Sequence, residues 1–551
     1  MNKDENWLVN DSVHWYMSEI TSRIVAKSGI PSDRFHLGKI ILQCLKDAPD
    51  FISQIDGATG ESETNASVLE RSVRCATCLR NLGIGHGDVM VLMAPNHIDL
   101  TVPLYAALYL GVIIAAVDRT LTETELQHTF AFSKPKIIFC QSDRAPDVQL
   151  TLNNLNLDAQ IVSFDSGDYL CSFSDFMENN ADDTPVEDFE PADFDPEESI
   201  SFLIATSGTT GLPKAAATTH KNFAIIIPYI WARASTFPTP TRLALIGSPL
   251  QWLTAILNFV KSPILRITRL QTSEKLTQQH AYDLINKYKP TYSIFSPTMM
   301  TTLLKPDIRD QCDFTCFRSL MLGGSAVPQD LIDELKEVAP NAEVANIYGM
   351  SELSGIAFHG DNPAPGSCGK PLGCFQYRII DVETQTDIYE PNTPGELWIK
   401  GPSIFKEYYN NVEATEETFA EDRWFKTGDT FYRDENWNFF FVERIKLLLK
   451  YTGYQISPVE IEGVIRQHPG VLDVAVTGIP DACGDLVVAC VVPHPDAKPT
   501  AQEIKDLVKD TLSDAKQLRG GVIFVDAIPV TASTKVHRRR LKEMALELPR
   551  E

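Results

Sequence analysis

The stretch TSGTTGLPKAA (residues 206–216) follows the apolar run ISFLIA and combines glycines, hydroxyl residues, one proline and one lysine. Glycine permits close backbone approach, hydroxyls can bond phosphate oxygens, and Lys214 supplies a positive charge. Ala215 stands where a nucleotide P-loop needs Ser or Thr, and a strand rather than a helix is expected next. The stretch therefore predicts a phosphate-holding turn between two strands and disfavours a P-loop NTPase. Taken alone, a tight turn without a ligand is the alternative. The candidate phosphate contacts are Ser207, Gly208, Thr209, Thr210, Gly211 and Lys214.

The rest of the chain surrounds this loop with strands that alternate with helices. Residues 88–118 and 321–352 both follow a strand–helix–strand rhythm, which predicts α/β units with mostly parallel sheets. Ligands of such sheets bind beyond the carboxyl ends of strands, where SGTTG, GGSA (323–326) and YGMSE (348–352) all fall. We expect these three loops to converge on one ligand.

Chain length and texture predict two domains. The 551 residues are too many for one compact core. Segments 395–410 and 437–451 are rich in strand-forming residues, and a small α/β unit follows them. The expected division is 1–445 and 446–551. The acidic, proline-bearing segment 177–199 is expected to be a surface connector.

Composition excludes some classes of protein. The net charge is −24, from 49 basic and 73 acidic residues, which disfavours general binding to nucleic acid or anionic membranes. The longest apolar run, residues 102–117, is short for a transmembrane segment and predicts a buried helix and strand. A polar, acidic beginning and the ending LPRE favour a cytoplasmic location. Cys75 and Cys78 have C-x-x-C spacing, but without a second pair they are expected to be reduced thiols on a helix.

Four motifs occur in a telling order: TSGTTGLPK, YGMSE, KTGD (426–429) and ERIKLLLKYTGYQISPVEIE (443–462). Together they resemble the acyl-adenylate-forming enzymes, a group that includes acyl-CoA synthetases, 4-coumarate–CoA ligases and insect luciferases. The resemblance covers the chain from residue 206 to the tail. It implies a large N-terminal domain of two βαβ-type sheet subdomains plus a β-barrel-like subdomain, with a small mobile α/β C-terminal domain.

The same resemblance implies a two-step reaction that uses ATP, Mg²⁺ and coenzyme A. A carboxylate attacks the α-phosphate of ATP to give acyl-AMP and pyrophosphate, and a thiol then displaces AMP. Tyr348 resembles the aromatic wall beside adenine, although alone it would more often be a core residue. Ser351 resembles a phosphate-binding hydroxyl and Glu352 the Mg²⁺ ligand, while Asp429 and Arg444 resemble the ribose contacts. Further implied nucleotide-side positions are Gly324, Ser325, Ala326 and Gly349.

The C-terminal segment carries residues that resemble moving parts of the family. Lys446 is similar to the hinge, and Lys535 to the lysine that enters the active site during adenylation. The catalytic set implied is thus Lys535, Lys214 and Glu352. Lys450 and Gly453 resemble the face presented for thioester formation.

Two departures from the family pattern lie in this segment. Thr534 precedes Lys535 where glycine is usual, and a β-branched residue is strained at positive φ. Glu443 replaces the usual Asp before Arg444, which is a mild change. The basic run 535–542 is expected to be a solvated helix after the catalytic loop rather than a localisation or nucleic-acid signal.

The acyl pocket is predicted from SPLQWLTAILNF (248–259), which matches the F-H-H-G-F segment of beetle luciferases. Trp252 stands where the second His is usual and Leu253 where the Gly is usual, while Gly323 lies on the acyl side of GGSA. With Ile256 and Leu257 these residues favour an apolar acid, such as a fatty acid. The alternative is that Trp252 packs into the core and never contacts the acid.

These expectations favour one function and leave alternative functions open. The sequence predicts an ATP-dependent carboxylate–CoA ligase that activates an apolar acid through acyl-AMP. A luciferase-type monooxygenase acting on an acyl-adenylate, or an adenylating enzyme for an aromatic acid, would use the same motifs. A nucleotide-binding relative without turnover is disfavoured by the intact Lys214, Glu352, Asp429 and Lys535. The oligomeric state stays open.

Overall fold

The computed structural model describes residues 17, 19–20, 22–23, 34–165, 171–182, 184–206, 214–230, 242–305, 308–359, 364–451, 454–481, 484–531 and 535–551. Predictions that fall on Ser207, Gly208, Thr209, Thr210, Gly211, Gly453 and Thr534 therefore lie outside the described residues.

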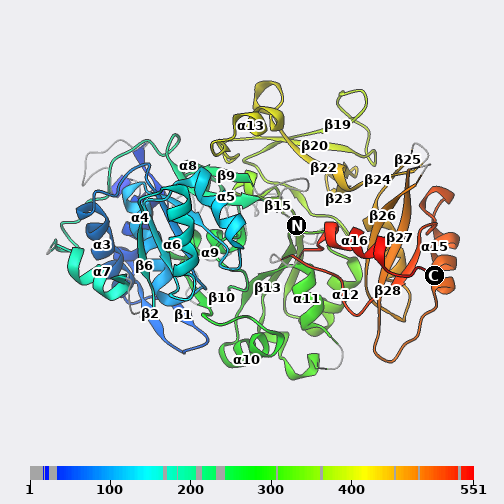
Figure 1. Ribbon diagram of the computed structural model, residues 1–551, viewed down its shortest axis with the longest axis horizontal. Helices are drawn as coiled ribbons and strands as arrows, with labels where there is room; N and C mark the ends of the chain where they lie inside the picture. Colours follow the sequence, from blue (N-terminus) through cyan, green and yellow to red (C-terminus); the bar gives the residue numbers. More distant parts are fainter. Residues whose placement is uncertain are drawn as a thin grey trace.

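An eight-stranded sheet carries the phosphate-loop strands (Figure 1). Its central strands are parallel because helices connect them, whereas β9 returns antiparallel to β8, as the sequence predicts for a strand after the loop. Helices α5 (Glu123–Ser133) and α6 (Ala145–Leu155) pack on one face, and α3 (Asn65–Asn81) and α4 (Thr101–Leu110) belong to the core on the other. In spatial order the strands are β21 (Glu407–Tyr408), β9 (Lys214–Thr219), β8 (Ile200–Thr206), β4 (Ile113–Ala116), β3 (Val89–Met93), β5 (Ile137–Cys140), β6 (Gln160–Ser163) and β7 (Cys171–Ser172).

A seven-stranded sheet forms the second α/β unit. All its pairings are parallel except that of β1 with β2. The spatial order is β14 (Glu343–Ile347), β13 (Ser319–Gly323), β12 (Tyr292–Phe295), β10 (Arg242–Leu245), β11 (Ile267–Gln271), β1 (Ile52–Asp56) and β2 (Ser62–Thr64). Its helices are α2 (Leu37–Asp47), α8 (His220–Ile230), α9 (Leu253–Leu265), α10 (Gln278–Tyr288), α11 (Pro297–Leu303) and α12 (Gln329–Val338).

The two sheets are joined by one large core that includes α4 and α9. Fully buried Arg269 of β11 donates to the hydroxyls of Tyr105 and Thr101, both on α4, at 2.8 and 2.9 Å. Buried polar groups are costly unless they are hydrogen-bonded, so this network fixes the relative placement of β11 and α4.

An antiparallel four-stranded sheet occupies the place of the predicted β-barrel-like subdomain, and a smaller C-terminal sheet follows it. The four strands are β19 (Gln376–Ile380), β20 (Gly395–Lys400), β22 (Phe425–Arg433) and β23 (Phe439–Arg444). The C-terminal elements are β24 (Leu449–Tyr451), β25 (Tyr454–Ile456), α14 (Pro458–Ile465), β26 (Val471–Asp481), β27 (Gly484–Pro493), α15 (Ala501–Thr511), β28 (Gly521–Phe524) and α16 (Arg538–Glu547).

The other helices, strands and turns are short. They are α7 (Phe173–Asn180), α13 (Val412–Thr418), β15 (Gly349–Met350), β16 (Gly355–Ile356), β17 (Phe358–His359), β18 (Lys370–Pro371) and the 3₁₀ turns η2 (Ile98–Leu100), η3 (Arg309–Gln311), η4 (Phe314–Cys316), η5 (Ser351–Leu353), η6 (Glu421–Arg423), η7 (Ile445–Leu447) and η8 (Asp514–Lys516).

Residues 102–117 and 177–199 are two segments for which the sequence makes a structural prediction. Residues 102–117 form the buried helix α4 and strand β4, as predicted, and within the described ranges no helix could cross a membrane. The prediction of a surface connector at 177–199 is wrong in part. Phe189 and Phe194 are only 3% and 4% exposed, because these two aromatic side chains anchor an otherwise acidic segment to the protein.

Candidate active site

Tyr348, Asp429 and Arg444 come together where the four-stranded sheet meets the end of β14. Asp429 and Arg444 are cross-strand partners in β22 and β23, and the Arg444 Nε lies 3.0 Å from the Asp429 Oδ1. The Tyr348 hydroxyl donates to the Asp429 Oδ2 at 2.6 Å. The Asp429 carboxylate raises the pKa of Arg444. Burial raises the pKa of Asp429, while Arg444 and Tyr348 oppose that rise.

A second set forms around the buried carboxylate of Glu352, which lies in η5. The Tyr408 hydroxyl donates to the Glu352 Oε1 at 2.7 Å, and burial raises the pKa of Glu352. Tyr408 belongs to β21, which pairs with β9, and the Lys214 Nζ lies 5.1 Å from the centre of the Tyr408 ring. Tyr408 thus connects two predicted site residues, and sequence reasoning missed it. The only signal was its position in KEYYN after a predicted strand.

Lys535 reaches this region from the C-terminal segment. The backbone before it is paired with the backbone after it, since the Thr531 N–H donates to the Lys535 carbonyl at 2.7 Å and Val530 forms a β-bridge with Val536. Its Cε lies 3.9 Å from the point where a Cβ on Gly324 would stand, and Gly324 has a φ of +93°. In Figure 1 this red end of the chain lies between the C-terminal sheet and the large domain.

The charges around Lys535 show which groups it faces. Burial lowers the pKa of Lys535, the cation of Arg444 adds to that effect, and Asp429 and Glu352 oppose it. We call Tyr348, Glu352, Asp429, Arg444 and Lys535 the convergent cluster. It joins residues of the large domain with one lysine from the C-terminal segment, so two positive groups and two carboxylates lie close enough to act on one another's charge.

Glycines shape the loops beside the cluster. A Cβ on Gly323 would stand 2.6 Å from the Ile347 carbonyl oxygen, and one on Gly349 would stand 2.4 Å from the Gly355 carbonyl oxygen. Neither distance can be accommodated, so both positions need glycine. Ser325 and Ala326 follow Gly324 in the loop before α12, and Ser351 begins η5 beside Glu352.

Other predicted residues lie at the connection to the C-terminal sheet. Lys446 is exposed in η7, between β23 and β24. Lys450 is exposed on β24, where its backbone N–H donates to the Asp485 carboxylate at 3.0 Å. No contact of the described residues brings Lys450 to the convergent cluster.

The predicted acyl-pocket residues sit at the start of α9. Trp252 is the N-cap residue and Leu253 opens the helix half-buried, whereas Ile256 and Leu257 are buried in the core between the sheets. The Trp252 Nε1 is buried and has no hydrogen-bond partner among the described residues. An unpartnered indole N–H can meet an acceptor on a bound molecule, although it does not identify one.

Two remaining expectations concern charge and thiols. The basic run does begin a helix, α16, but Arg538 is not solvated as predicted. Its guanidinium donates to the Glu462 Oε1 at 3.1 Å and to the Val476 carbonyl at 2.8 Å, because α16 packs on β26.

Cys75 and Cys78 are buried on α3, and no cluster of three or more candidate ligands for a metal ion occurs in the part of the chain described.

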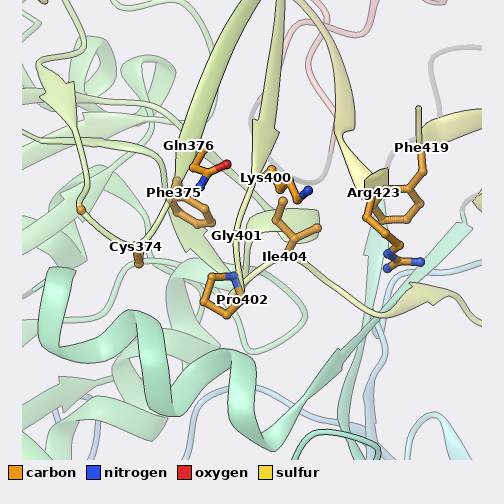
Figure 2. Close-up of a pocket in the computed structure, with 10 residues that line it drawn as sticks. Cys374, Phe375, Gln376, Lys400, Gly401, Pro402, Ile404, Phe419 and Arg423 are labelled. Atoms are coloured by element: carbon orange, nitrogen blue, oxygen red, sulfur yellow. The ribbon is translucent and has the colours of Figure 1, made fainter. Parts of the chain in front are cut away.

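A cavity of about 440 Å³ lies outside the convergent cluster (Figure 2). Lys400 and Arg423 supply its positive charges and Phe419 part of its wall, and none of its lining residues is a predicted site residue. It adjoins the active-site region at Ile404 and Phe419, both of which neighbour Phe405, and the Phe405 N–H donates to the Glu352 carbonyl at 2.7 Å.

Two family models match separate segments of the chain. The family model described as AMP-binding enzyme matches residues 43–409, and that described as AMP-binding enzyme C-terminal domain matches residues 460–535. The chain is 32% identical to a luciferin 4-monooxygenase of Photuris pensylvanica, covering 90% of this chain and 92% of that protein. It is 30% identical to 4-coumarate-CoA ligase 1 of Narcissus pseudonarcissus, covering 94% and 95%.

A solved structure supports the fold. The crystal structure of the anthranilate CoA ligase AuaEII in complex with anthranoyl-AMP superimposes with a TM-score of 0.85 at 21% identity. The superposition covers 94% of this chain and 98% of that one. The large N-terminal domain and the smaller C-terminal domain therefore share the fold of that structure.

Proposed function

The chain belongs to the AMP-binding enzyme family of adenylate-forming proteins, and from that membership we propose that it is an ATP-dependent ligase joining an apolar carboxylic acid to coenzyme A. The observation that carries the proposal is the entry of Lys535 into the cluster of Glu352, Asp429 and Arg444. A lysine brought there from the C-terminal segment can bridge an acyl carboxylate and a phosphate. Its charge would then offset the negative charge that grows in the transition state.

In the first step the residues of the large domain bind and orient ATP. The phosphate loop ending at Lys214 holds the terminal phosphates, and Tyr348 lies against the adenine. At the ribose, Asp429 accepts hydrogen bonds and Arg444 donates them. The ion pair between the two side chains, at 3.0 Å, already holds them in position. The acid then attacks the α-phosphate while Lys535 neutralises charge at the reacting groups.

Glu352 is the residue that would hold Mg²⁺. Its carboxylate is buried and oriented by Tyr408, and Mg²⁺ is commonly bound by one or two carboxylates together with substrate phosphates. A single protein carboxylate therefore fits a metal that arrives with ATP. When bound, Mg²⁺ supplies charge neutralisation at the phosphates.

The second step transfers the acyl group to the thiol of coenzyme A. We propose that Lys446 is the hinge about which residues 446–551 turn, and that Lys450 and Gly453 then face the site. Lys446 is exposed in the short turn between the two domains, as a hinge residue must be. Lys450 is exposed in the present orientation and would be free to take part after rotation.

An apolar acid is the proposed substrate because of Trp252 and Leu253 at the head of α9. A tryptophan there provides a large apolar wall with one donor, whereas the matched histidine of beetle luciferases offers a polar ring. Aromatic acids are the competing substrate class, since a 4-coumarate-CoA ligase is among the similar proteins.

The deciding experiment is a panel of acids assayed for pyrophosphate release, acyl-AMP and acyl-CoA. The panel spans medium and long fatty acids, benzoates and hydroxycinnamates, each with and without coenzyme A. We expect acid-dependent pyrophosphate release with a fatty acid and acyl-CoA only when coenzyme A is present. Folded protein that releases no pyrophosphate with any acid would overturn the proposal.

A second candidate is an oxygenase that acts on an acyl-adenylate. It is favoured by the 32% identity to a luciferin 4-monooxygenase and uses the same first step. Light emission from luciferin, ATP and oxygen tests it directly. Emission well above that of a Lys535→Ala control would support the oxygenase.

A further inference from the structure

Glu443 is a buried carboxyl group at the connection between the two domains. It lies on β23, three residues before Lys446, and is only 2% exposed. Its Oε1 accepts from the Arg444 N–H at 2.9 Å, but its Oε2 is buried without a hydrogen-bond partner among the residues described. A buried carboxylate oxygen that lacks a partner is costly, so the group needs either a proton or a strong opposing charge.

The groups opposite Glu443 belong to the C-terminal segment. Helix α14 packs on β23, where the Ser457 hydroxyl donates to the Val442 carbonyl at 3.3 Å. The positive charge of Arg538 on α16 lowers the pKa of Glu443, but Arg538 donates its hydrogen bonds to Glu462 and to the Val476 carbonyl. One guanidinium thus faces two carboxyl groups. Glu462 has more hydrogen bonds than Glu443, because it also accepts from the Val476 N–H at 2.8 Å.

The balance of these effects favours a proton on Glu443. Burial raises the pKa of Glu443 to about 7 from an ordinary 4.5, and the charge of Glu462 adds to the rise. Arg538 and the backbone N–H groups of Arg444 and Val459 oppose it. The cross-strand neighbour on β22 is the uncharged Thr430. The charged side chains that act on Glu443, Glu462 of α14 and Arg538 of α16, both follow Lys446 in the chain.

We propose that Glu443 is a positioning residue that links the orientation of the C-terminal domain to one proton. With Glu443 protonated, the domain rests in the observed orientation, which inserts Lys535 into the convergent cluster. Turning about Lys446 would carry α14 and α16 away, expose the Glu443 carboxyl to water and release its proton to solvent. The role given to the proton rests on the proposed two-step function, but the orientation of the C-terminal domain can be measured in the absence of any substrate.

The sign of the pH dependence follows from linkage. The orientation that binds the proton more tightly is favoured as pH falls. With a pKa of about 7 in the observed orientation and the ordinary 4.5 for a solvent-exposed carboxyl in the rotated one, both orientations are protonated below pH 4.5, and only the observed one keeps the proton between 4.5 and about 7. The ratio of rotated to observed orientation should therefore rise by up to tenfold per pH unit across that window and flatten above it. The full change has an upper limit of about 300-fold, which is the difference in proton affinity expressed as a ratio.

The experiment measures energy transfer between two fluorescent unnatural amino acids in the full-length protein. One replaces Val412 on α13 and the other Leu546 on α16, which are 71% and 57% exposed. The pair is scanned from pH 5 to 8 without substrates. We expect wild type to shift with pH and to level off near 7. Glu443→Gln, which mimics the protonated group, should stay in the low-pH state throughout.

Two further variants separate the proton from mere packing. Glu462→Gln removes the second carboxylate and should move the wild-type transition to lower pH. Glu460→Gln alters an exposed carboxylate of the same helix that pairs with Lys516 at 2.6 Å, and should leave the curve unchanged. If Glu443→Gln does not fold, the wild-type curve and its displacement in Glu462→Gln still decide the matter.

The half-reactions give the functional readout once an acid is known. At pH 7.5 Glu443→Gln should keep acyl-AMP formation and slow thioester formation from supplied acyl-AMP by tenfold or more. A wild-type orientation that is independent of pH, or a Glu443→Gln variant that rests in the high-pH state, would overturn the inference. Failure of every acid in the panel would instead count against the proposed ligase, since the orientation assay needs neither acid nor coenzyme A.

Discussion

Replacing Tyr408 by Phe should weaken the use of magnesium–ATP while leaving the fold intact. The hydroxyl donates to the Glu352 Oε1 at 2.7 Å, and a side-chain hydrogen bond with Thr418 is a second polar interaction. The Lys214 Nζ lies 5.1 Å from the ring centre, and the Phe405 and Tyr408 ring centroids are 4.9 Å apart; phenylalanine would keep both contacts. Because Tyr408 is only 9% exposed, water cannot easily replace the lost donor.

The expected size of the effect follows from the type of hydrogen bond. A hydrogen bond to a charged group contributes about 1.5–3 kcal/mol net. At about 1.4 kcal/mol per factor of ten, its loss corresponds to roughly 10- to 150-fold. The carboxylate of Glu352 is the proposed Mg²⁺ ligand, so the loss should appear as weaker binding of ATP in the presence of Mg²⁺ and as a higher KM for ATP.

Two measurements and a matched control test this reasoning. Calorimetric titration with ATP at fixed Mg²⁺ reports binding without turnover, and pyrophosphate release reports activity. Tyr409→Phe removes the adjacent hydroxyl, for which the structure records no hydrogen bond within the described residues, and should behave as wild type. If Tyr408→Phe binds ATP as wild type does, or if both variants lose equally, Tyr408 does not orient Glu352 for this purpose.

Three other substitutions address different parts of the molecule. Lys535→Ala should lower acyl-AMP formation by about 100-fold or more, while thioester formation from supplied acyl-AMP is retained; equal losses in both half-reactions would contradict the assigned role. Burial lowers the pKa of Lys261 on α9 to about 7 from 10.5, so its folded form resists a proton that the unfolded chain binds. Lys261→Met should therefore be most stabilised relative to wild type at and below pH 7, and should lose about 2 kcal/mol of that advantage between pH 7 and pH 9, as urea unfolding of both proteins would show; a constant difference would mean that the amine is already charged in the folded protein. Trp252→Ala should change the ratio of kcat/KM between bulky and short acids by about tenfold or more in competition assays, whereas an unchanged ratio would place Trp252 in the core.

Local patterns were enough to predict the frame of the site. The strand β9 after the phosphate loop, the buried α4 and β4, and the loops GGSA and YGMSE after β13 and β14 all follow from periodicity and strand endings. These features depend on residues close together in sequence, where turn chemistry and apolar spacing decide the backbone. The order of the motifs then indicated that Tyr348, Asp429 and Arg444 meet, and the structure brings them together.

Contacts between distant elements were beyond that reasoning. Tyr408 lies 56 residues after Glu352, and it reaches the carboxylate only because β21 adds to the edge of β9. Phe189 and Phe194 are buried within a segment whose average composition is that of a solvated connector. In each case a single side chain is positioned by tertiary packing, and no pattern in its own neighbourhood records the partner.

Strand β23 explains why the change from Asp to Glu at position 443 matters although it looks mild in sequence. Successive side chains of a strand point to opposite faces, so Arg444 and Glu443 necessarily face different surroundings. Arg444 meets Asp429 of the convergent cluster, and Glu443 meets α14 and Arg538 of the C-terminal segment. The substitution keeps a carboxyl group, and the carboxyl of Glu443 lies near the guanidinium of Arg538 and a second carboxylate, Glu462. One strand thus carries the partner of Asp429 on one face and the carboxyl group that faces α14 and α16 on the other, immediately before Lys446.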